Sequence, residues 1–386
     1  MASARSMAGV HRMDMDLMDM LISLAGILLV VTILWDAFET IVLPRRVRRR
    51  VRLTRLFYRV TWAGWSALAR RVPPGSPRET MLSIYGPLSL LFLLAVWAVG
   101  LVGGFTLLHW GAGSTMVGPE GPVGVGGIFY TSGSTFFTLG IGDITPRSTI
   151  GRVLTVAEAG TGIAFLALVI GYLPVIYQAF SRREVSIALL DARAGSPPSA
   201  AELLRRHGKG EDSAALVTFL QAWERWSAEL LESHLSYAVL AYYRSQHDSQ
   251  SWLAALTLVL DVCALALVGM DGVSAHQARL TFAMARHAAV DLSQIFGTPP
   301  QRPRTDRLPP ADLGRLRATL AAAGLPLQDG EAADRKLAEV RAKYEPYVNA
   351  LAEYLLITLP PWAPAEAAVD DWQTSVYEHV PVTRLP

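Results

Sequence analysis

The residues with the clearest chemical potential form the short run 138–143, in which two glycines alternate with larger residues. The run consists of Thr138, Leu139, Gly140, Ile141, Gly142 and Asp143. A dehydrated cation in a membrane needs a ring of oxygen atoms in place of its water shell, and backbone carbonyls supply that ring when they point the same way. Glycine makes such a backbone accessible because it has no Cβ. The spacing therefore predicts a cation-binding backbone.

Such a loop must be held at membrane depth by helices, and the sequence supplies them on both sides. A short helix over about residues 127–137 would direct the negative end of its dipole toward the cation. The apolar stretches 82–108 and 150–180 are each long enough to cross a bilayer, which takes about 20 helical residues. Arg182 and Arg183 mark the cytoplasmic end of the second stretch. The segment 111–148 between the stretches is then either an external loop or a re-entrant one.

A further apolar run, 20–43, carries Asp36 and Glu39 near its far end, where a membrane interface would tolerate them. It lacks the basic start and the cleavage site of a signal peptide, so we expect an uncleaved span with the N-terminus outside. The arginines that follow predict a cytoplasmic segment that contacts anionic lipid rather than nucleic acid. They are Arg45, Arg46, Arg48, Arg49, Arg50, Arg52, Arg55 and Arg59.

The composition is typical of a membrane protein and excludes several other classes. Of the 386 residues, 51% are hydrophobic and 18% are charged, against about 25% charged in soluble domains. The single cysteine, Cys263, excludes an intrachain disulfide framework and any multi-cysteine metal site. The sequence has no nucleophile elbow, zinc-protease motif or phosphate-binding loop, so we expect neither enzymatic activity nor a cofactor.

Residues 138–146 and the spans on either side resemble the pore loop of tetrameric potassium channels, including the bacterial two-transmembrane type, whose filter reads T-x-G-[YF]-G-D. The resemblance covers about residues 82–180. It implies an all-α membrane protein with a re-entrant pore loop. It also implies a homotetramer, because one loop supplies a quarter of a filter, with K⁺ as its only metal ion. Ile141 replaces the aromatic residue that braces the family's filter, and Phe137 replaces its second threonine.

The resemblance also implies roles for individual residues around the filter. The ion-coordinating positions are Thr138, Leu139, Gly140, Ile141 and Gly142, with the Thr138 hydroxyl forming the innermost site. Asp143 would lie at the outer mouth, either hydrogen-bonded behind the filter or capping a turn. Gly162 falls at the hinge position of the inner helix. Helical spacing from it places one apolar stripe toward the cavity, although lipid contact would need the same stripe. The stripe consists of Ile163, Leu166, Ala167 and Ile170.

Glu158 lies within the apolar stretch 150–180. A carboxylate inside a span is costly and indicates a functional site by default. We expect it behind the filter, hydrogen-bonded to the hydroxyl of Ser134 or Thr135 and supporting the filter. The alternative is a water-exposed carboxylate near the outer end of the span.

Residues 181–386 have the composition of a helical soluble domain with a proline-rich break at 298–310. The apolar run 252–270 could be a fourth span, but Asp261 at its centre and the lack of a basic flank favour a buried core helix. One helix is expected over 334–358. No nucleotide-binding or alternating strand–helix pattern occurs, so the ligand of this domain is unknown.

These observations predict four regions in a multi-pass protein of the plasma membrane. They are a short external N-terminus with the first span (1–43), a basic cytoplasmic segment (44–80), a pore module (81–180) and a cytoplasmic helical domain (181–386). The predicted function is passive conduction of K⁺. The alternatives are a weakly selective cation channel, a subunit of a potassium-uptake transporter, and a non-conducting, membrane-anchored helical signalling protein.

Overall fold

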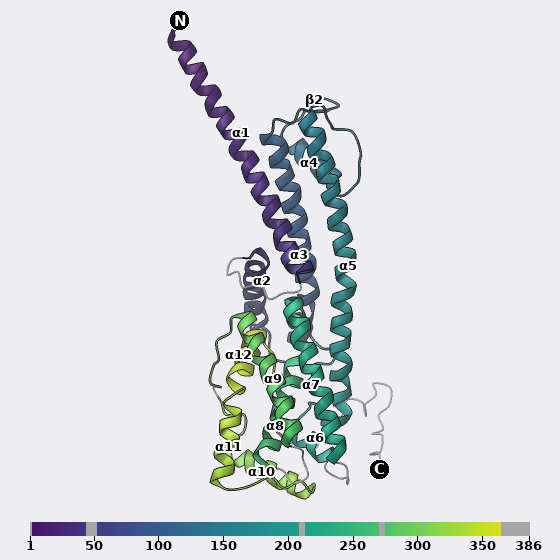
Figure 1. Cartoon of the computed structure of the whole chain (residues 1–386), viewed down its shortest axis with the longest axis vertical. Helices are drawn as coiled ribbons and strands as arrows, with labels where there is room; N and C mark the ends of the chain where they lie inside the picture. The colour runs from purple at the N-terminus through teal and green to yellow at the C-terminus, as the bar shows by residue number, and fades with distance from the viewer. Residues whose placement is uncertain (1, 44–51, 208–212, 270–274, 304, 364–386) are drawn as a thin grey trace. The chain divides into compact units, whose positions relative to one another are not determined.

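The computed structural model describes residues 2–43, 52–207, 213–269, 275–303 and 305–363, and it consists almost entirely of helices (Figure 1). The chain forms two compact units. Unit 1 contains residues 1–63 and 88–176, and unit 2 contains residues 64–87 and 177–386. Three helices pass from one unit into the other: α2 (Leu53–Ala69), α3 (Ser76–Gly111) and α5 (Thr149–Ala194).

Unit 1 is built from long apolar helices that pack closely. Helix α1 (Ala2–Ala37) continues as a π-helical turn (Phe38–Val42) and lies against α3. A Cβ added to Gly104 would lie 2.6 Å from a Val30 methyl group, and one added to Gly100 would lie 2.3 Å from Ile33. Small residues allow membrane helices to approach in this way. The core is completed by Trp97, Leu101, Phe105 and Phe136.

Asp36 is buried at the inner end of α1. It accepts hydrogen bonds from the Trp97 indole at 3.1 Å and from the backbone N–H of Thr54 at 3.1 Å, at the start of α2. Glu39 is also buried and pairs with Arg52 at 3.3 Å. The far end of this run tolerates these two carboxylates because local donors satisfy both. Of the expected lipid-contacting arginines, those at 45–50 lie outside the described residues.

The segment between α3 and α5 holds a helix and a small sheet. Helix α4 (Val125–Phe136) confirms the short helix expected before residues 138–143. The sheet was not expected. It has the order β2-β1-β3, with β1 (Met116–Gly118) antiparallel to both β2 (Gly121–Pro122) and β3 (Thr145–Pro146). The pairing of Val117 with Thr145 joins the two arms of the segment on either side of α4.

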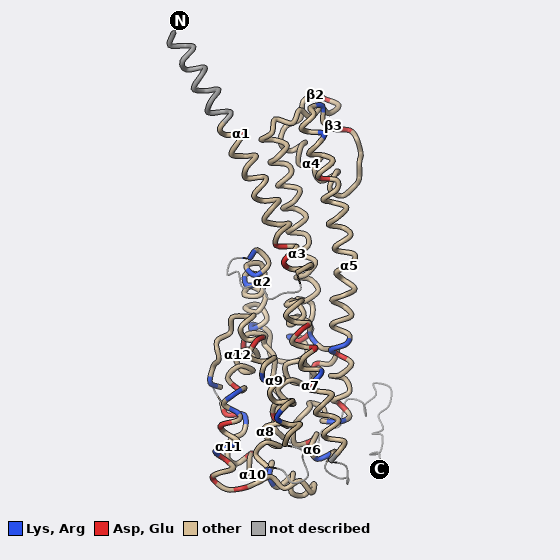
Figure 2. The backbone as a smooth tube through the Cα atoms, viewed as in Figure 1, with Lys and Arg blue, Asp and Glu red and all other residues tan. Residues whose placement is uncertain are grey.

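Within the described part of the chain, four helices are long and apolar enough to cross a membrane: Leu17–Val42, α3, α5 and α8 (Trp252–Gly269). Charged residues are sparse along α3, α4 and the part of α5 in unit 1, and frequent along the helices of unit 2 (Figure 2). Helix α8 differs from the others because 89% of its apolar window is buried, against 17% for α1 and 11% for α5. The expectation of a buried core helix is confirmed.

Helix α8 is the centre of unit 2. It packs with α7 (Ser213–Ser236) and α9 (Ala275–Phe296), and α6 (Ala200–His207) also contacts it. A 3₁₀ helix, η2 (Ala238–Tyr242), follows α7. The remaining helices are α10 (Pro310–Ala322), α11 (Glu331–Arg341) and α12 (Glu345–Leu355). The single helix expected over 334–358 is thus two helices. The break falls just before Pro346, which lacks the backbone N–H that an uninterrupted helix needs.

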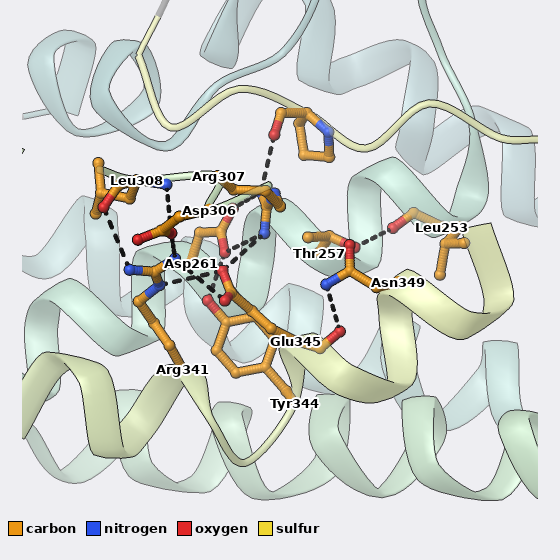
Figure 3. A network of polar contacts seen from close by, with 11 residues as sticks. Leu253, Thr257, Asp261, Asp306, Arg307, Leu308, Arg341, Tyr344, Glu345 and Asn349 are labelled. Atoms are coloured by element: carbon orange, nitrogen blue, oxygen red, sulfur yellow. Dashed lines mark hydrogen bonds and ion pairs between the residues drawn. The ribbon is translucent and has the colours of Figure 1, made fainter. Parts of the chain in front are cut away.

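A polar network fixes the proline-rich segment onto this core (Figure 3). Asp261 of α8 is fully buried and binds Arg307 at 2.6 Å and the Tyr344 hydroxyl at 2.5 Å. Arg307 also donates to the Pro360 carbonyl at 2.8 Å and approaches Glu345 at 3.4 Å. Burial alone would lower the pKa of Arg307, but the carboxylates of Asp261 and Glu345 raise it. The guanidinium therefore stays charged.

Candidate functional site

The run predicted to bind a cation has an alternating backbone. The φ angles of Thr138, Gly140 and Gly142 are +59°, +59° and +77°, whereas Leu139 and Ile141 between them are not left-handed. Threonine is β-branched, so its left-handed conformation is a genuine outlier, and such outliers cluster at functional sites. Backbone that alternates between left-handed and other conformations can turn successive carbonyls toward one side, which is what a cation-binding backbone requires.

The N–H groups at the start of this segment are held by hydrogen bonds to α4. The N–H groups of Thr138 and Leu139 donate to the Thr135 and Ser134 carbonyls at 3.0 and 2.8 Å, and the Gly140 N–H lies 3.5 Å from the Ser134 carbonyl. Within the described chain, none of the backbone hydrogen bonds ends on a carbonyl of residues 138–142. These oxygens are available as ligands, which is the arrangement that can replace the water shell of a cation.

Ser134 and Thr135, at the C-terminus of α4, thus hold residues 138–140 through their backbone carbonyls. The helix dipole places partial negative charge at this end. The side chains of Leu139 and Ile141 are 66% and 57% exposed in the single chain, so the described residues leave most of their surface uncovered. Phe137 is also exposed, whereas its neighbour Phe136 is buried against Phe165 of α5, with ring centroids 5.6 Å apart.

Gly162 packs directly against the end of α4. A Cβ added there would lie 2.0 Å from the Phe136 carbonyl oxygen, so any side chain would displace α4 or α5. Helix α5 runs through this position unbroken. The close contact is therefore a reason for glycine that helical periodicity did not reveal. The predicted stripe of Ile163, Leu166, Ala167 and Ile170 lies on an exposed face of α5.

Glu158 lies in a buried polar cluster behind α4, but its partner is different from the one expected. Its carboxylate is 3.6 Å from the His109 Nε2 atom at the end of α3, and both side chains are 1% exposed. The His109 Nδ1 atom lies 3.1 Å from the Ser114 hydroxyl, and Ser132 of α4 faces the same carboxylate. The expected pairing with Ser134 or Thr135 is wrong. The alternative of a water-exposed carboxylate is also wrong.

His109 is the site residue that the sequence did not reveal. It stands alone in an apolar stretch, and Glu158 lies 49 positions further along the chain. The only available signal was that a buried carboxylate requires a partner. Asp143, by contrast, is exposed and accepts a hydrogen bond from the N–H of Ile144 at 3.0 Å, which is a turn contact. Its carboxylate also interacts with the Tyr130 hydroxyl.

Helices that are long and apolar enough to cross a membrane, on either side of a segment whose carbonyls accept no backbone hydrogen bond among the described residues, define the class as a helical membrane protein. Residues 91–178 match the family described as ion channel, and this range includes α4 and the segment 138–142. Among the described residues, no group of three or more His, Cys, Asp or Glu side chains is placed to hold a metal ion.

An uncharacterised membrane protein of Bacillus subtilis (strain 168), YdjJ, is 25% identical to this chain over 181 residues. The aligned region covers 46% of this chain and 52% of YdjJ, so the chain spans about half the length of that relative. No solved structure matches the chain.

Proposed function

We propose that this protein is a potassium-selective channel that conducts K⁺ passively through a filter made by four identical chains. One observation carries the proposal: left-handed backbone at Thr138, Gly140 and Gly142 within a segment that matches the ion channel family. Four copies of the segment 138–142 around one axis would place their backbone carbonyls in stacked rings. The Thr138 hydroxyls would form the innermost site.

The surrounding residues have supporting roles in this proposal. Ser134 and Thr135 hold the filter strand through backbone carbonyls, and Glu158, paired with His109, joins α5 to α3 behind the filter. Asp143 would raise the cation concentration at the outer mouth. Gly162 is the position where α5 meets α4 and would be the gating hinge, and the exposed stripe on α5 would line the cavity. We expect no cofactor and no enzymatic activity.

The membrane arrangement belongs to the same proposal. The N-terminus would lie outside and the helical domain in the cytoplasm of a plasma-membrane protein, because positive charge accumulates on the cytoplasmic side. The arginines of residues 45–59 would contact anionic lipid at the inner surface. Of these, Arg52, Arg55 and Arg59 lie among the described residues, and Arg55 and Arg59 are exposed.

The first test is ion flux from liposomes that contain the purified full chain. Potassium flux is expected, and Gly140→Ala should abolish it. A left-handed backbone costs an L-residue about 1–2 kcal/mol, so the substitution would turn the carbonyl ring out of register. Gly126→Ala in α4 is the matched control, because its φ is ordinary and nothing lies within 4 Å of an added Cβ. Flux that persists in Gly140→Ala would contradict the assignment of the filter.

Ile141 supports a second candidate, a weakly selective cation channel. Its side chain is 57% exposed in the single chain and replaces a bracing aromatic residue. The same liposomes loaded with sodium distinguish the two candidates. Potassium flux well above sodium flux supports selectivity, and equal fluxes support the second candidate. The absence of any flux, at either ion and in every lipid, would favour a non-conducting signalling protein.

A further inference from the structure

The segment 238–244, called here the clamp segment, contacts two helices that lead into the ion channel region. It comprises η2 followed by Tyr243 and Arg244. All its contacts described below are within unit 2, whose residues 76–87 belong to α3 and whose residues 177–194 belong to α5. The two helices are far apart in sequence, so this segment is a physical link between them.

The link to α5 is made by one buried arginine. Arg183 is 4% exposed and donates to the Leu240 carbonyl at 2.8 Å and to the Tyr243 carbonyl at 2.9 Å. Glu184 pairs with the same guanidinium at 2.8 Å. The Tyr243 ring lies 5.6 Å from that of Phe180. These charge-assisted hydrogen bonds fix the position of the clamp segment on α5, because moving it away would leave buried polar groups unsatisfied, which is costly.

The link to α3 is made by packing and by one ion pair. The Tyr242 ring contacts Tyr85 edge-on, with centroids 5.2 Å apart, and Arg244 lies 3.7 Å from Glu79. A Cβ added to Gly86 would lie 2.7 Å from the Tyr243 ring and 3.1 Å from the Tyr242 carbonyl oxygen. The segment therefore lies against the bare backbone of α3.

The helical domain holds the clamp segment from its other side. Trp252 at the start of α8 donates to the Ala241 carbonyl at 3.2 Å. The Tyr242 hydroxyl meets that of Tyr354 in α12 at 3.0 Å, and Arg244 donates to the Leu356 carbonyl at 3.3 Å. A rearrangement of α8 or α12 would therefore reach both α3 and α5 through these seven residues.

Each of the two helices carries a proline beyond its clamp contacts, in the direction of the channel region. Pro87 follows Gly86 directly in α3, and Pro174 precedes Arg183 in α5. An internal proline removes one helical hydrogen bond and is a common cause of bending. Both helices thus have a point at which they can bend between the clamp segment and the residues around the filter.

We propose that the clamp segment couples the helical domain to gating, by setting the separation of the α3 and α5 ends that lead to the pore. The inference rests on the proposed channel function and identifies how that function is regulated. Loosening the clamp should shift the balance between open and closed states without altering the filter. Allosteric couplings of this kind typically change an equilibrium by about 5–150-fold.

The test uses two variants of the full chain with matched controls, recorded as single channels in planar bilayers. Gly86→Ala pushes Tyr243 away from α3, and its control is Gly103→Ala in the same helix, where an added Cβ has nothing within 4 Å. Arg183→Met removes the guanidinium from α5, and its control is Arg182→Met, whose side chain is exposed. Size-exclusion chromatography and thermal unfolding establish that each variant is folded.

Both variants should change the open probability by about tenfold and in the same direction, because they weaken one restraint. The single-channel current and the ratio of potassium to sodium should stay at wild-type values, as should the controls. Wild-type open probability in folded Gly86→Ala would overturn the proposal, and so would opposite shifts or a change in selectivity. If Arg183→Met does not fold, Gly86→Ala decides alone.

A second measurement does not depend on conduction. A spin label at Gln178→Cys, an exposed position on α5, reports distances between copies of the chain, and buried Cys263 does not compete for the label. Gly86→Ala should shift the distance distribution, whereas Gly103→Ala should not. An unchanged distribution overturns the clamp. If the wild-type protein passes no ions but Gly86→Ala still shifts the distance distribution, the channel proposal is refuted and the link made by the clamp segment is supported.

Discussion

The two units hold their polar groups in place by different means. In unit 1 the segment 138–142 is held by backbone hydrogen bonds, α4 packs on the bare backbone of Gly162, and the buried His109–Glu158 pair lies behind α4. In unit 2 buried guanidiniums, those of Arg183 and Arg307, join segments that are distant in sequence. Unit 1 should therefore be intolerant of added volume, and unit 2 of lost charge.

The largest expected effect is the loss of a charge in unit 2. Arg307→Met should lower the free energy of unfolding by about 3–5 kcal/mol, because it leaves the fully buried Asp261 carboxylate without its cation. Among the described residues, the Tyr344 hydroxyl would remain as a hydrogen-bond donor to that carboxylate, with Arg341 as the nearby cation. Chemical unfolding followed by tryptophan fluorescence measures the change.

The matched control for this change is Arg315→Met. Arg315 pairs with Asp312 at the surface, and its side chain is 76% exposed. Surface pairs contribute about 0–1 kcal/mol, so this variant should unfold close to wild type. Equal losses of unfolding free energy in the two variants would mean that burial does not make Arg307 more important than Arg315. The claim that unit 2 depends on buried charge would then be wrong.

Added volume in unit 1 should come next in size. Gly162→Ala places a methyl group 2.0 Å from the Phe136 carbonyl, and overpacking of this kind typically costs about 1–3 kcal/mol. The displaced end of α4 should also abolish potassium flux. Gly160→Ala in the same helix meets nothing within 4 Å and should conduct normally. Normal flux in Gly162→Ala would show that α4 and α5 can move apart here without affecting conduction, and would contradict this prediction.

Much of the fold could be predicted from the lengths of the apolar stretches, because the length of a stretch is a local property of the sequence. The short helix before residues 138–143 was predicted correctly, because the alternating glycines after it indicated a backbone that needs the negative end of a helix dipole. The burial of α8 was predicted correctly, because Asp261 interrupts an apolar run without a basic flank. The break at residues 342–344 was missed, although Pro346, the second residue of α12, lies close to it. The three-stranded sheet has strands of two or three residues, too short to give a periodic signal.

Of the site, the glycine alternation was readable, whereas the partners were not. The sequence indicated that Glu158 needs a partner but could not select His109 over nearby hydroxyls, because the choice depends on how α3 and α5 pack. Arg183 seemed only to mark the end of a span, yet it is buried among carbonyls of a segment more than 50 residues away. Tertiary contacts of this range leave no periodic trace.

A smaller effect sharpens the account of unit 2, because there a buried group must stay neutral. Burial and the neighbouring Arg183 guanidinium lower the pKa of His234 from 6.5 to about 3. Its Nε2 atom lies 3.4 Å from Arg183 Nη1 and its Nδ1 atom 2.8 Å from the Leu230 carbonyl. Ser233 and the Trp252 ring also face the imidazole, and Glu184 lies beyond Arg183. The neutral ring fits, donating to Leu230 and accepting from Arg183.

Between these two pKa values the folded state binds fewer protons than the unfolded state. The free energy of unfolding is therefore unaffected by His234 above pH 6.5 and falls as the pH drops toward 3, by about 2 kcal/mol at pH 5. His234→Gln should lose this part of the pH dependence between pH 7 and pH 5, even if its overall stability is lower. His247→Gln, at an exposed position, should keep the wild-type slope. A wild-type slope in His234→Gln would mean that the acid sensitivity of unit 2 arises from other groups, and that its buried cation tolerates a second charge beside it.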